Sequence, residues 1–271
     1  MNPETIIQAL QEGSMIAYLG PDIFKGSLMP SSTEETILAL NGGRAMAPKL
    51  MQEVSKAAMS IEQRRGRGHI EGMCIDVFGR EKSLQPAHEL LLRLGAKVIF
   101  DTNRDTVLLD ALASCRHFLL KGIARISASP KRYALYVWEE GAYVEAQTWD
   151  EQAPLIIKPM GCALPMPSFV ISDADYVDWL TEAMGGFAYP AWFKAYRKGK
   201  QILYLGESFA KDTQRMVARE STIECAGGVV VHEGPLEKAE RRFVEGQGLA
   251  TQQYSTQGFV EMLKTLVEKG E

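Results

Sequence analysis

Short apolar runs recur along the chain, and each ends at a glycine or a polar residue. Five of them span residues 15–19, 98–100, 155–157, 202–205 and 229–231. Continuous apolar runs of this length, without alternation of polar and apolar positions, are typical of strands buried on both faces of a parallel sheet. We therefore expect these five segments to be strands of one such sheet.

The segments between these runs carry apolar residues at helical spacing. Helices are expected over residues 86–94, 106–113, 173–184 and 256–268, the third with Ser172 as its cap. Strands that alternate with helices predict an α/β fold, with a doubly wound, mostly parallel, Rossmann-like sheet and helices on both faces. Such folds bind ligands beyond the carboxyl ends of the strands.

Two stretches interrupt the alternation. Residues 30–69 are expected to be helical up to a Gly/Arg run at 64–69, and residues 131–149 are expected to form a β-hairpin that turns at 139–141. The apolar stripe of the helical stretch consists of Leu50, Val54, Ala57 and Ile61. We interpret the chain as a single domain, 1–271, with a helical insertion at about 25–85 and a hairpin insertion at about 117–153.

The amino-acid composition argues against several classes of function. The 271 residues include 30 Lys+Arg and 34 Asp+Glu, a net charge of −4, which argues against broad nucleic-acid binding. No apolar run approaches the roughly 18 residues that a membrane span needs, and no signal-peptide pattern is present, so a cytoplasmic location is expected. The four cysteines, Cys74, Cys115, Cys162 and Cys225, are too scattered for a zinc or redox motif.

The strongest chemical signal follows the expected strand 98–100. Thr102, Asn103 and Asp105 would place short polar side chains at the ligand edge of the sheet. An asparagine amide both donates and accepts hydrogen bonds, so Asn103 could hold a ribose hydroxyl or a water molecule. Asn103 or Asp105 could equally cap the helix that follows. The motif by itself leaves these two interpretations open.

Several motifs in a fixed order resemble the sirtuin-like superfamily. Residues 101–105 resemble its Thr-Thr-Asn-x-Asp signature, with Asp101 in place of the first threonine. The other matching pieces are 18–23 (the glycine-rich opening loop), 88–92 (the Pro-x-x-His-x-x-Leu helix), 158–161 (Lys-Leu-His-Gly), 175–176, 205–209 with Asp212 (Gly-x-Ser-Leu/Phe-x-x-Asp) and 228–232. Each motif is weak alone, and the ordered set carries the resemblance.

The resemblance implies binding of NAD or ADP-ribose, an adenine dinucleotide, across the sheet. Asn103 would position the ribose or the attacking water, and Asp105 would support its loop. The residues that the resemblance places against the dinucleotide are Gly20, Pro21, Asp22, Thr102, Asn103, Gly206, Ser208 and His232. Active members of the family cleave the nicotinamide–ribose bond, which requires a base for a hydroxyl or water. Gly20 and the helix start after it would face the pyrophosphate.

The sequence departs from the family at two places. Met160 stands at the position of the catalytic histidine, and a thioether cannot accept a proton at neutral pH. Pro21 removes a backbone N–H from the opening loop, and the carboxylate of Asp22 would repel a pyrophosphate. We therefore expect a degenerate member with an accessory or regulatory role, which could act with a protein partner or as an oligomer.

An active NAD glycohydrolase with Asn103 and a non-standard base is the alternative function. A lysine deacylase is the least favoured, because the zinc-binding cysteines of that branch are absent and only Cys115 lies between Asn103 and Met160. The resemblance is therefore to the zinc-free branch, whose members hydrolyse NAD or serve in bacterial defence and accessory systems. No metal site is expected.

Four histidines could replace the missing base: His69, His88, His117 and His232. His88 is interpreted as a structural, hydrogen-bonded histidine and His117 as a helix C-terminal contact. His69 lies in the Gly/Arg run and His232 at a strand end on the ligand side. The sequence does not place either of them near Asn103.

Other polar and aromatic clusters have structural interpretations that compete with functional ones. The run 64–69 could bind phosphate through its arginines, but a solvated, flexible loop is the preferred interpretation. The acids at 173, 175 and 178 are interpreted as helix-start residues rather than metal ligands. The aromatic residues Tyr133, Trp138, Tyr143 and Trp149 are interpreted as cross-strand packing first and as a partner surface second.

Overall fold

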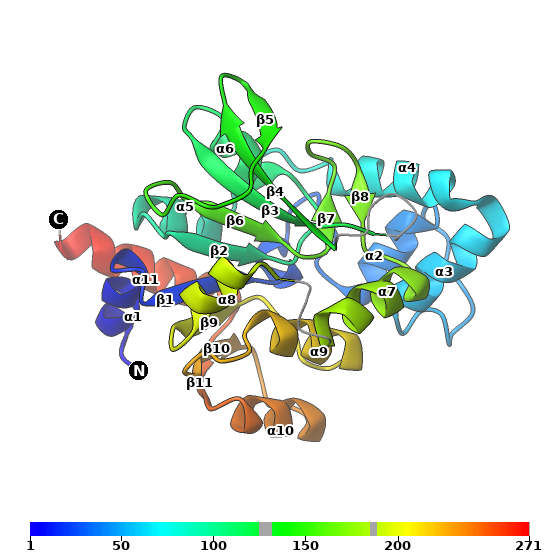
Figure 1. The fold of residues 1–271 in the computed structure, drawn as a ribbon. Helices are drawn as coiled ribbons and strands as arrows, with labels where there is room; N and C mark the ends of the chain where they lie inside the picture. The colour runs from blue at the N-terminus through cyan, green and yellow to red at the C-terminus, as the bar shows by residue number, and fades with distance from the viewer. Residues whose placement is uncertain (125–131, 185–188, 271) are drawn as a thin grey trace.

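Figure 1 shows the computed structural model, which describes residues 1–124, 132–184 and 189–270. The strand order of its main sheet is β11-β10-β9-β1-β2-β6-β3-β4-β5. These strands are β1 (Met15–Leu19), β2 (Val98–Asp101), β3 (His117–Gly122), β4 (Tyr133–Glu139), β5 (Ala142–Glu145), β6 (Leu155–Lys158), β9 (Gln201–Leu205), β10 (Gly228–His232) and β11 (Leu249–Gln253). Among the described strands of this sheet, the pairs β3–β4 and β4–β5 are antiparallel and the other pairs are parallel. The short strands β7 (Gly161–Cys162) and β8 (Ser168–Phe169) form a separate antiparallel pair.

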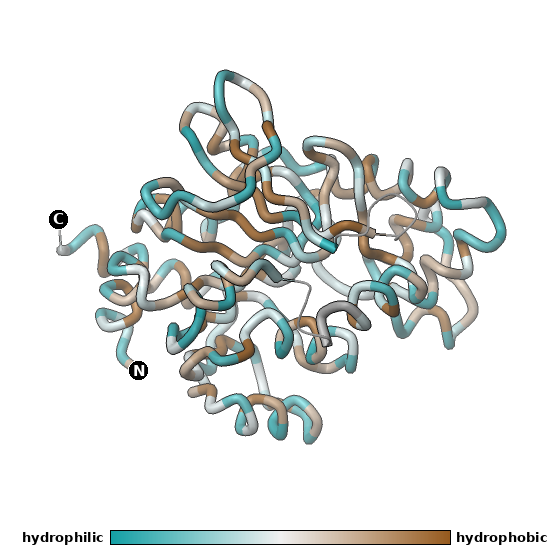
Figure 2. Tube along the Cα trace, in the orientation of Figure 1, coloured by the Kyte–Doolittle hydropathy of each residue, from teal (hydrophilic) through white to brown (hydrophobic). Residues whose placement is uncertain are grey.

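The strands expected from unbroken apolar runs are the interior of this sheet. Successive residues of a strand point to opposite faces, and both faces are buried here. In β1, Ala17 and Leu19 join one hydrophobic core, whereas Ile16 and Tyr18 join the other. The central strands are mostly brown in Figure 2 because both of their faces are apolar. The continuous runs are therefore the signature of a two-sided core.

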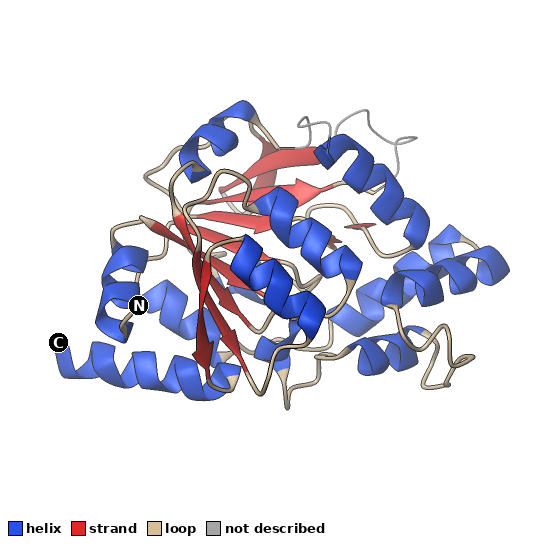
Figure 3. Cartoon of the chain, turned by 90° about the horizontal axis from the view of Figure 1, so that it is seen from below, coloured by secondary structure: helices blue, strands red, loops and turns tan. Residues whose placement is uncertain are grey.

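Helices cover both faces of the sheet, as Figure 3 shows. The helices whose buried residues join the core of Ala17 and Leu19 are α1 (Pro3–Gln11), η1 (Pro21–Phe24), α2 (Thr33–Leu40), α3 (Val54–Arg65), α4 (Arg67–Phe78), α5 (Pro86–Arg93), α6 (Val107–Ala111) and α11 (Thr256–Gly270). The other core receives α7 (Asp173–Met184), α8 (Ala191–Arg197), α9 (Asp212–Ser221) and α10 (Lys238–Gly246). The structure confirms the predicted α/β fold with a mostly parallel, Rossmann-like sheet.

The strand order reverses direction between β1 and β9. From β1 the chain continues to its neighbour β2 on one side, and from β9 it continues to β10 on the other. Residues 15–19 of β1 pair in parallel with β9 along their whole length. Ligands of doubly wound sheets bind at such a switch point, outside the carboxyl ends of the strands. The fold therefore directs attention to the loops after β1, β2 and β9.

The helical insertion differs in detail from its prediction. It contains α2, α3 and α4, but residue 50 lies in a turn before α3, so the predicted stripe begins at Val54. The expected flexible loop at 64–69 is wrong: Gly66, with φ 86°, separates two consecutive helices, and Arg67 begins α4. The run of arginines is therefore an ordered helix junction.

The hairpin is confirmed and extends the main sheet as its edge. Glu140 and Gly141 form its turn with positive φ values of 52° and 83°, and Trp138 packs across from Tyr143. Trp149 instead packs on α8, against Trp192 and Tyr196. The predicted hairpin insertion, at about 117–153, begins in β3, a strand that pairs with β6 inside the sheet, and its residues 125–131 lie outside the described residues.

Within the described residues, no helix combines the length and apolar character that crossing a membrane requires.

Candidate functional site

A cavity opens at the switch point of the sheet, between the ends of β1, β2 and β9. It encloses about 910 Å³ when the space open to solvent at its mouth is included. Its floor and walls include Tyr18 of β1, Thr102 and Asn103 after β2, and Glu207 after β9. The α2 and α3 helices of the insertion contribute the opposite wall, which includes Thr36, Glu53, Val54 and Ser55. The sequence motifs and the insertion thus meet at one site.

Asn103 is held rigidly in this cavity. Its side-chain nitrogen donates to the carbonyl oxygen of Gly20 at 3.2 Å and to the carboxylate of Asp101 at 2.9 Å. Its backbone N–H donates to the same carboxylate at 3.0 Å. Both amide protons are therefore engaged, and the side-chain oxygen remains as an acceptor. Asn103 can thus accept a hydrogen bond from a hydroxyl or a water molecule in the cavity.

Glu207 is an unexpected acid in the cavity wall. Its Oε1 accepts from the backbone N–H of Ser208 at 3.0 Å and from the side-chain nitrogen of Gln214 at 3.3 Å. Its Oε2 lies 3.2 Å from the Thr102 hydroxyl, which is also 2.9 Å from the Leu19 carbonyl oxygen. These contacts fix the carboxyl group beside the loop that carries Asn103.

The surroundings of Glu207 change its acidity. Burial raises its pKa to about 8, although hydrogen bonds from Ser208 and Thr102 and the positive charge of Arg104 oppose this effect. A carboxyl group with a pKa near the ambient pH can both accept and release a proton. Perturbed carboxyl groups in a cavity mark candidate functional sites. Sequence reasoning did not select Glu207, because a glutamate after a strand resembles an ordinary solvated loop residue.

The opening loop after β1 does not present free backbone donors. The N–H of Gly20 donates to Leu205, that of Asp22 donates to Gly206, and Pro21 has none. A Cβ at Gly20 would lie 2.4 Å from the carbonyl oxygen of Gly206, so this glycine permits close contact between two loops. Pro21 lines the cavity, but the Asp22 carboxylate accepts from Thr256 in α11 and is absent from the lining. The expected repulsion from Asp22 therefore does not arise at the wall of the cavity.

Groups suited to an anion lie instead at the start of α9. Lys211 precedes this helix and lines the cavity together with Thr213 and Gln214 of its first turn. Within the described residues, the amine of Lys211 forms no ion pair. A helix N-terminus and an ammonium group both favour negative charge. This wall of the cavity fits phosphate groups better than the loop after β1 does.

Met160, the residue that the resemblance aligns with a histidine, is buried and lines the cavity. None of the four histidines, all of which are described, contributes to the cavity lining. His88 accepts from the backbone N–H of Gln85 and lies buried in α5, which supports its structural interpretation. His117 is bonded to Tyr143, and His69 contacts Arg65.

Asp105 is buried and does not line the cavity. Its Oδ1 accepts from the N–H of Val107, the first residue of α6, at 2.8 Å, whereas the N-cap of that helix is Thr106. Its Oδ2 is 3.2 Å from the amine of Lys158, which also lies 2.6 Å from Asp101. All three side chains are fully buried. Burial lowers the pKa of Lys158, but the two carboxylates outweigh this and raise it above its usual value.

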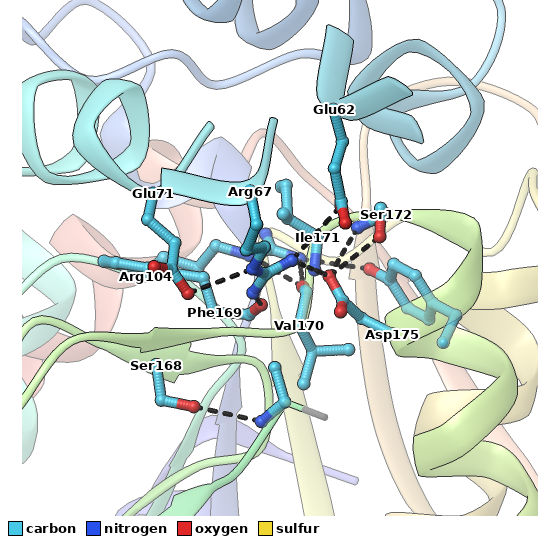
Figure 4. A network of polar contacts seen from close by, with 12 residues as sticks. Glu62, Arg67, Glu71, Arg104, Ser168, Phe169, Val170, Ile171, Ser172 and Asp175 are labelled. Atoms are coloured by element: carbon cyan, nitrogen blue, oxygen red, sulfur yellow. Dashed lines mark hydrogen bonds and ion pairs between the residues drawn. The ribbon is translucent and has the colours of Figure 1, made fainter. Parts of the chain in front are cut away.

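A second network of charged residues connects α4 of the helical insertion to the segment that leads from β8 into α7, as Figure 4 shows. Arg67 of α4 contacts Asp175 at 2.7 Å and Glu71 at 3.0 Å, and donates to the Phe169 carbonyl oxygen at 2.8 Å. Arg104 donates to the Val170 carbonyl oxygen one residue further along. Asp175 also accepts from the N–H groups before α7, so the expected helix-start role of this acid is confirmed. The network joins the insertion to the loop between β8 and α7.

The remaining residues that the resemblance selected lie outside the cavity lining. Gly206 and Ser208 flank Glu207, and His232 ends β10 with its ring nitrogen 2.6 Å from the Gly234 carbonyl oxygen. Within the described ranges, no group of histidine, cysteine or acidic side chains could hold a metal ion. No protein-family model matches the sequence, and a search of the curated proteins finds no match.

Proposed function

We propose that this chain is a zinc-free, sirtuin-like protein that binds NAD or a related adenine dinucleotide in the cavity at the switch point. The observation that carries the proposal is the position of Asn103. Asn103 lines the cavity at the carboxyl end of β2, where doubly wound sheets bind ligands, and its side-chain nitrogen is engaged by Gly20 and Asp101, which leaves the side-chain oxygen to accept. The ordered motifs of the sequence support the same assignment.

The chemistry of the cavity wall fits the parts of a dinucleotide. Asn103 would accept from a ribose hydroxyl, and the apolar side chains of Tyr18, Met29 and Phe78 would cover a ring. The pyrophosphate would lie against Lys211 and the first turn of α9, because the N–H groups of the loop after β1 are already bonded. This arrangement differs from the one that the resemblance implies, in which Gly20 faces the pyrophosphate.

The presence of methionine at position 160 bears on whether the chain is an accessory protein or an enzyme. A thioether cannot serve as a general base, which supports a degenerate member with an accessory or regulatory role. The second candidate is an NAD glycohydrolase with a non-standard base. The observation in its favour is Glu207, a carboxyl group with a raised pKa in the same cavity.

Calorimetric titration with NAD and with ADP-ribose tests the binding proposal. Thr213→Trp would fill the cavity from the first turn of α9, and we expect at least tenfold weaker binding. Met216→Trp is the matched control, because this residue is exposed on the same helix and outside the cavity lining. Equal nucleotide affinities of the two variants would show that the ligand binds at another site. Failure of both nucleotides to bind the unmodified protein would refute the proposal.

A further inference from the structure

The cavity lacks the base of the family but contains other ionisable groups. Lys211 and Arg104 are cationic, Tyr176 and Tyr18 are the two tyrosines of the lining, and burial raises the pKa of Tyr18. Two carboxyl groups remain, Glu53 and Glu207. Glu53 forms an ion pair with Lys56 at 2.6 Å on α3. Glu207 has no ion pair within the described residues and lies beside Thr102, which directly precedes Asn103.

We propose that Glu207 is the proton acceptor of an NAD-cleaving reaction in this cavity and takes the role of the histidine that Met160 replaces. The proposal rests on the dinucleotide binding proposed above. It goes beyond binding because it assigns a catalytic residue and a reaction. Three features of geometry carry it: Glu207 faces the cavity, its carboxyl group is anchored at both oxygens, and Met160 and Asn103 line the same space.

The reaction is a hydrolysis with water as the second reactant. The bond between C1′ of the ribose and the nicotinamide nitrogen breaks, and its electron pair neutralises the ring, so that nicotinamide leaves. The oxygen of a water molecule bonds to C1′ to give ADP-ribose. The proton of that water passes to the carboxylate of Glu207 and then to solvent. Asn103 would hold the water by accepting its second hydrogen.

The charge of Glu207 suits the reacting group. The nicotinamide ring of NAD is a cation, and positive charge moves to the ribose as the bond breaks. A carboxylate nearby would stabilise that charge in a partly dehydrated cavity. The charged and titratable groups that interact with Glu207 electrostatically are Tyr18 of β1, Arg104 after β2 and Tyr204 of β9. Those that line the cavity with it from other elements are Tyr176 of α7, Lys211 before α9 and Glu53, the residue before α3.

The single hydroxyl proton of Thr102 links this residue to the protonation of Glu207. The hydroxyl can donate to Glu207 or to the Leu19 carbonyl oxygen, but not to both at full strength. Donation to Glu207 stabilises the ionised carboxylate. Replacing Thr102 by valine removes that stabilisation and is expected to raise the pKa of Glu207. A purely structural role for Glu207 would give no such shift in a pH profile.

The test measures nicotinamide release from NAD between pH 6 and pH 9.5. For the unmodified protein we expect kcat/KM to rise with pH, with a midpoint near pH 8 that reports the free protein. Glu207→Gln should lower kcat by at least about 100-fold, the usual contribution of one general base, while calorimetry shows NAD affinity within about threefold. Glu53→Gln removes the other carboxylate of the wall and should keep the pH-dependent rise. Thr102→Val should move the midpoint upwards.

The outcomes separate the two proposals. If NAD binds but no nicotinamide is released at any pH, the role of Glu207 is refuted and the binding proposal stands. Turnover by Glu207→Gln with an unchanged pH profile would assign the proton to another group. If NAD does not bind, both proposals fall. If Glu207→Gln unfolds at a much lower temperature than the unmodified protein, Glu207→Asp and Thr102→Val provide the test. The proposal then requires that each variant stays folded and either lowers the rate or shifts its pH midpoint.

Discussion

Replacing Lys158 by methionine would leave two buried acids without their shared cation. Lys158 lies 2.6 Å from Asp101 and 3.2 Å from Asp105, and no atom of the three side chains reaches solvent. Methionine matches the aliphatic part of the lysine side chain but lacks its charged end. Breaking a buried ion pair from one side costs about 3–5 kcal/mol of unfolding free energy, because a charge is left without compensation. Two acids share this lysine, so we expect a loss of about 4–5 kcal/mol.

The loss should depend on pH with a definite sign. Burial raises the pKa of Asp101, and the charge of Lys158 opposes this effect. Without Lys158 the pKa of Asp101 in the folded state rises further above its unfolded value, so the folded variant binds a proton more readily. Its stability therefore falls as pH rises through that range. The deficit should be larger at pH 8 than at pH 5.5.

Urea unfolding followed by circular dichroism at both pH values measures this deficit. A chain of this size loses about 2–4 °C in Tm per kcal/mol, so thermal unfolding should begin about 8–20 °C lower. Lys121→Met is the matched control: this lysine is also buried, but it donates to the carbonyl oxygens of Leu164 and Met166. It should cost only about 1–3 kcal/mol, since no carboxylate is left unpaired. A loss below about 1 kcal/mol for Lys158→Met, or an equal loss at both pH values, would refute the reasoning.

Three further predictions follow from other contacts. Gly228→Ala would place a Cβ 1.9 Å from the Ile202 carbonyl oxygen at a φ of 152°, so chemical denaturation should show a loss on the order of 3 kcal/mol; an unchanged midpoint would contradict the glycine requirement. Arg67→Met removes the cation beside the buried Asp175 and should cost about 2 kcal/mol in the same assay, with Arg64→Met as an exposed control that costs less than about 0.5 kcal/mol. Cys115 is exposed, whereas burial raises the pKa of Cys74 to about 12; a thiol reagent at pH 8 should therefore modify Cys115 in the native protein and Cys74 only after unfolding, as peptide mass spectrometry would show.

The interior strands could be predicted because burial on both faces leaves a continuous apolar run. The same logic fails at the margins of the sheet. β11 (Leu249–Gln253) is largely exposed at the edge and therefore carries no apolar signal. β3 (His117–Gly122) is fully buried, yet it contains His117 and Lys121, whose polar groups are bonded to neighbours far along the sequence. Polar residues that are satisfied by tertiary partners break the local pattern.

Only part of the candidate site could be predicted from the sequence, because some of its residues belong to local motifs and others do not. Thr102, Asn103 and Met160 belong to ordered motifs, and the structure brings them into one cavity. Glu207 and Lys211 lie in ordinary polar loops by sequence, and only the packing of the strands and helices around them reveals their positions. The acidity of Glu207 arises from burial, which a local sequence pattern does not encode. The ionic link between residues 101 and 158 likewise exists only once β2 and β6 are paired.

The order of the strands has a consequence for how the chain folds. β1 gains its first partner when β2 emerges, but its other edge waits for β9, roughly a hundred residues later. At about 5–20 residues per second, that edge stays open for about 5–20 s during synthesis. An apolar strand with unpaired N–H and C=O groups readily pairs with another chain. The chain is therefore most exposed to aggregation after β1 has been synthesised and before β9 has. Pairing of β1 with β9 closes the open edge and ends this period.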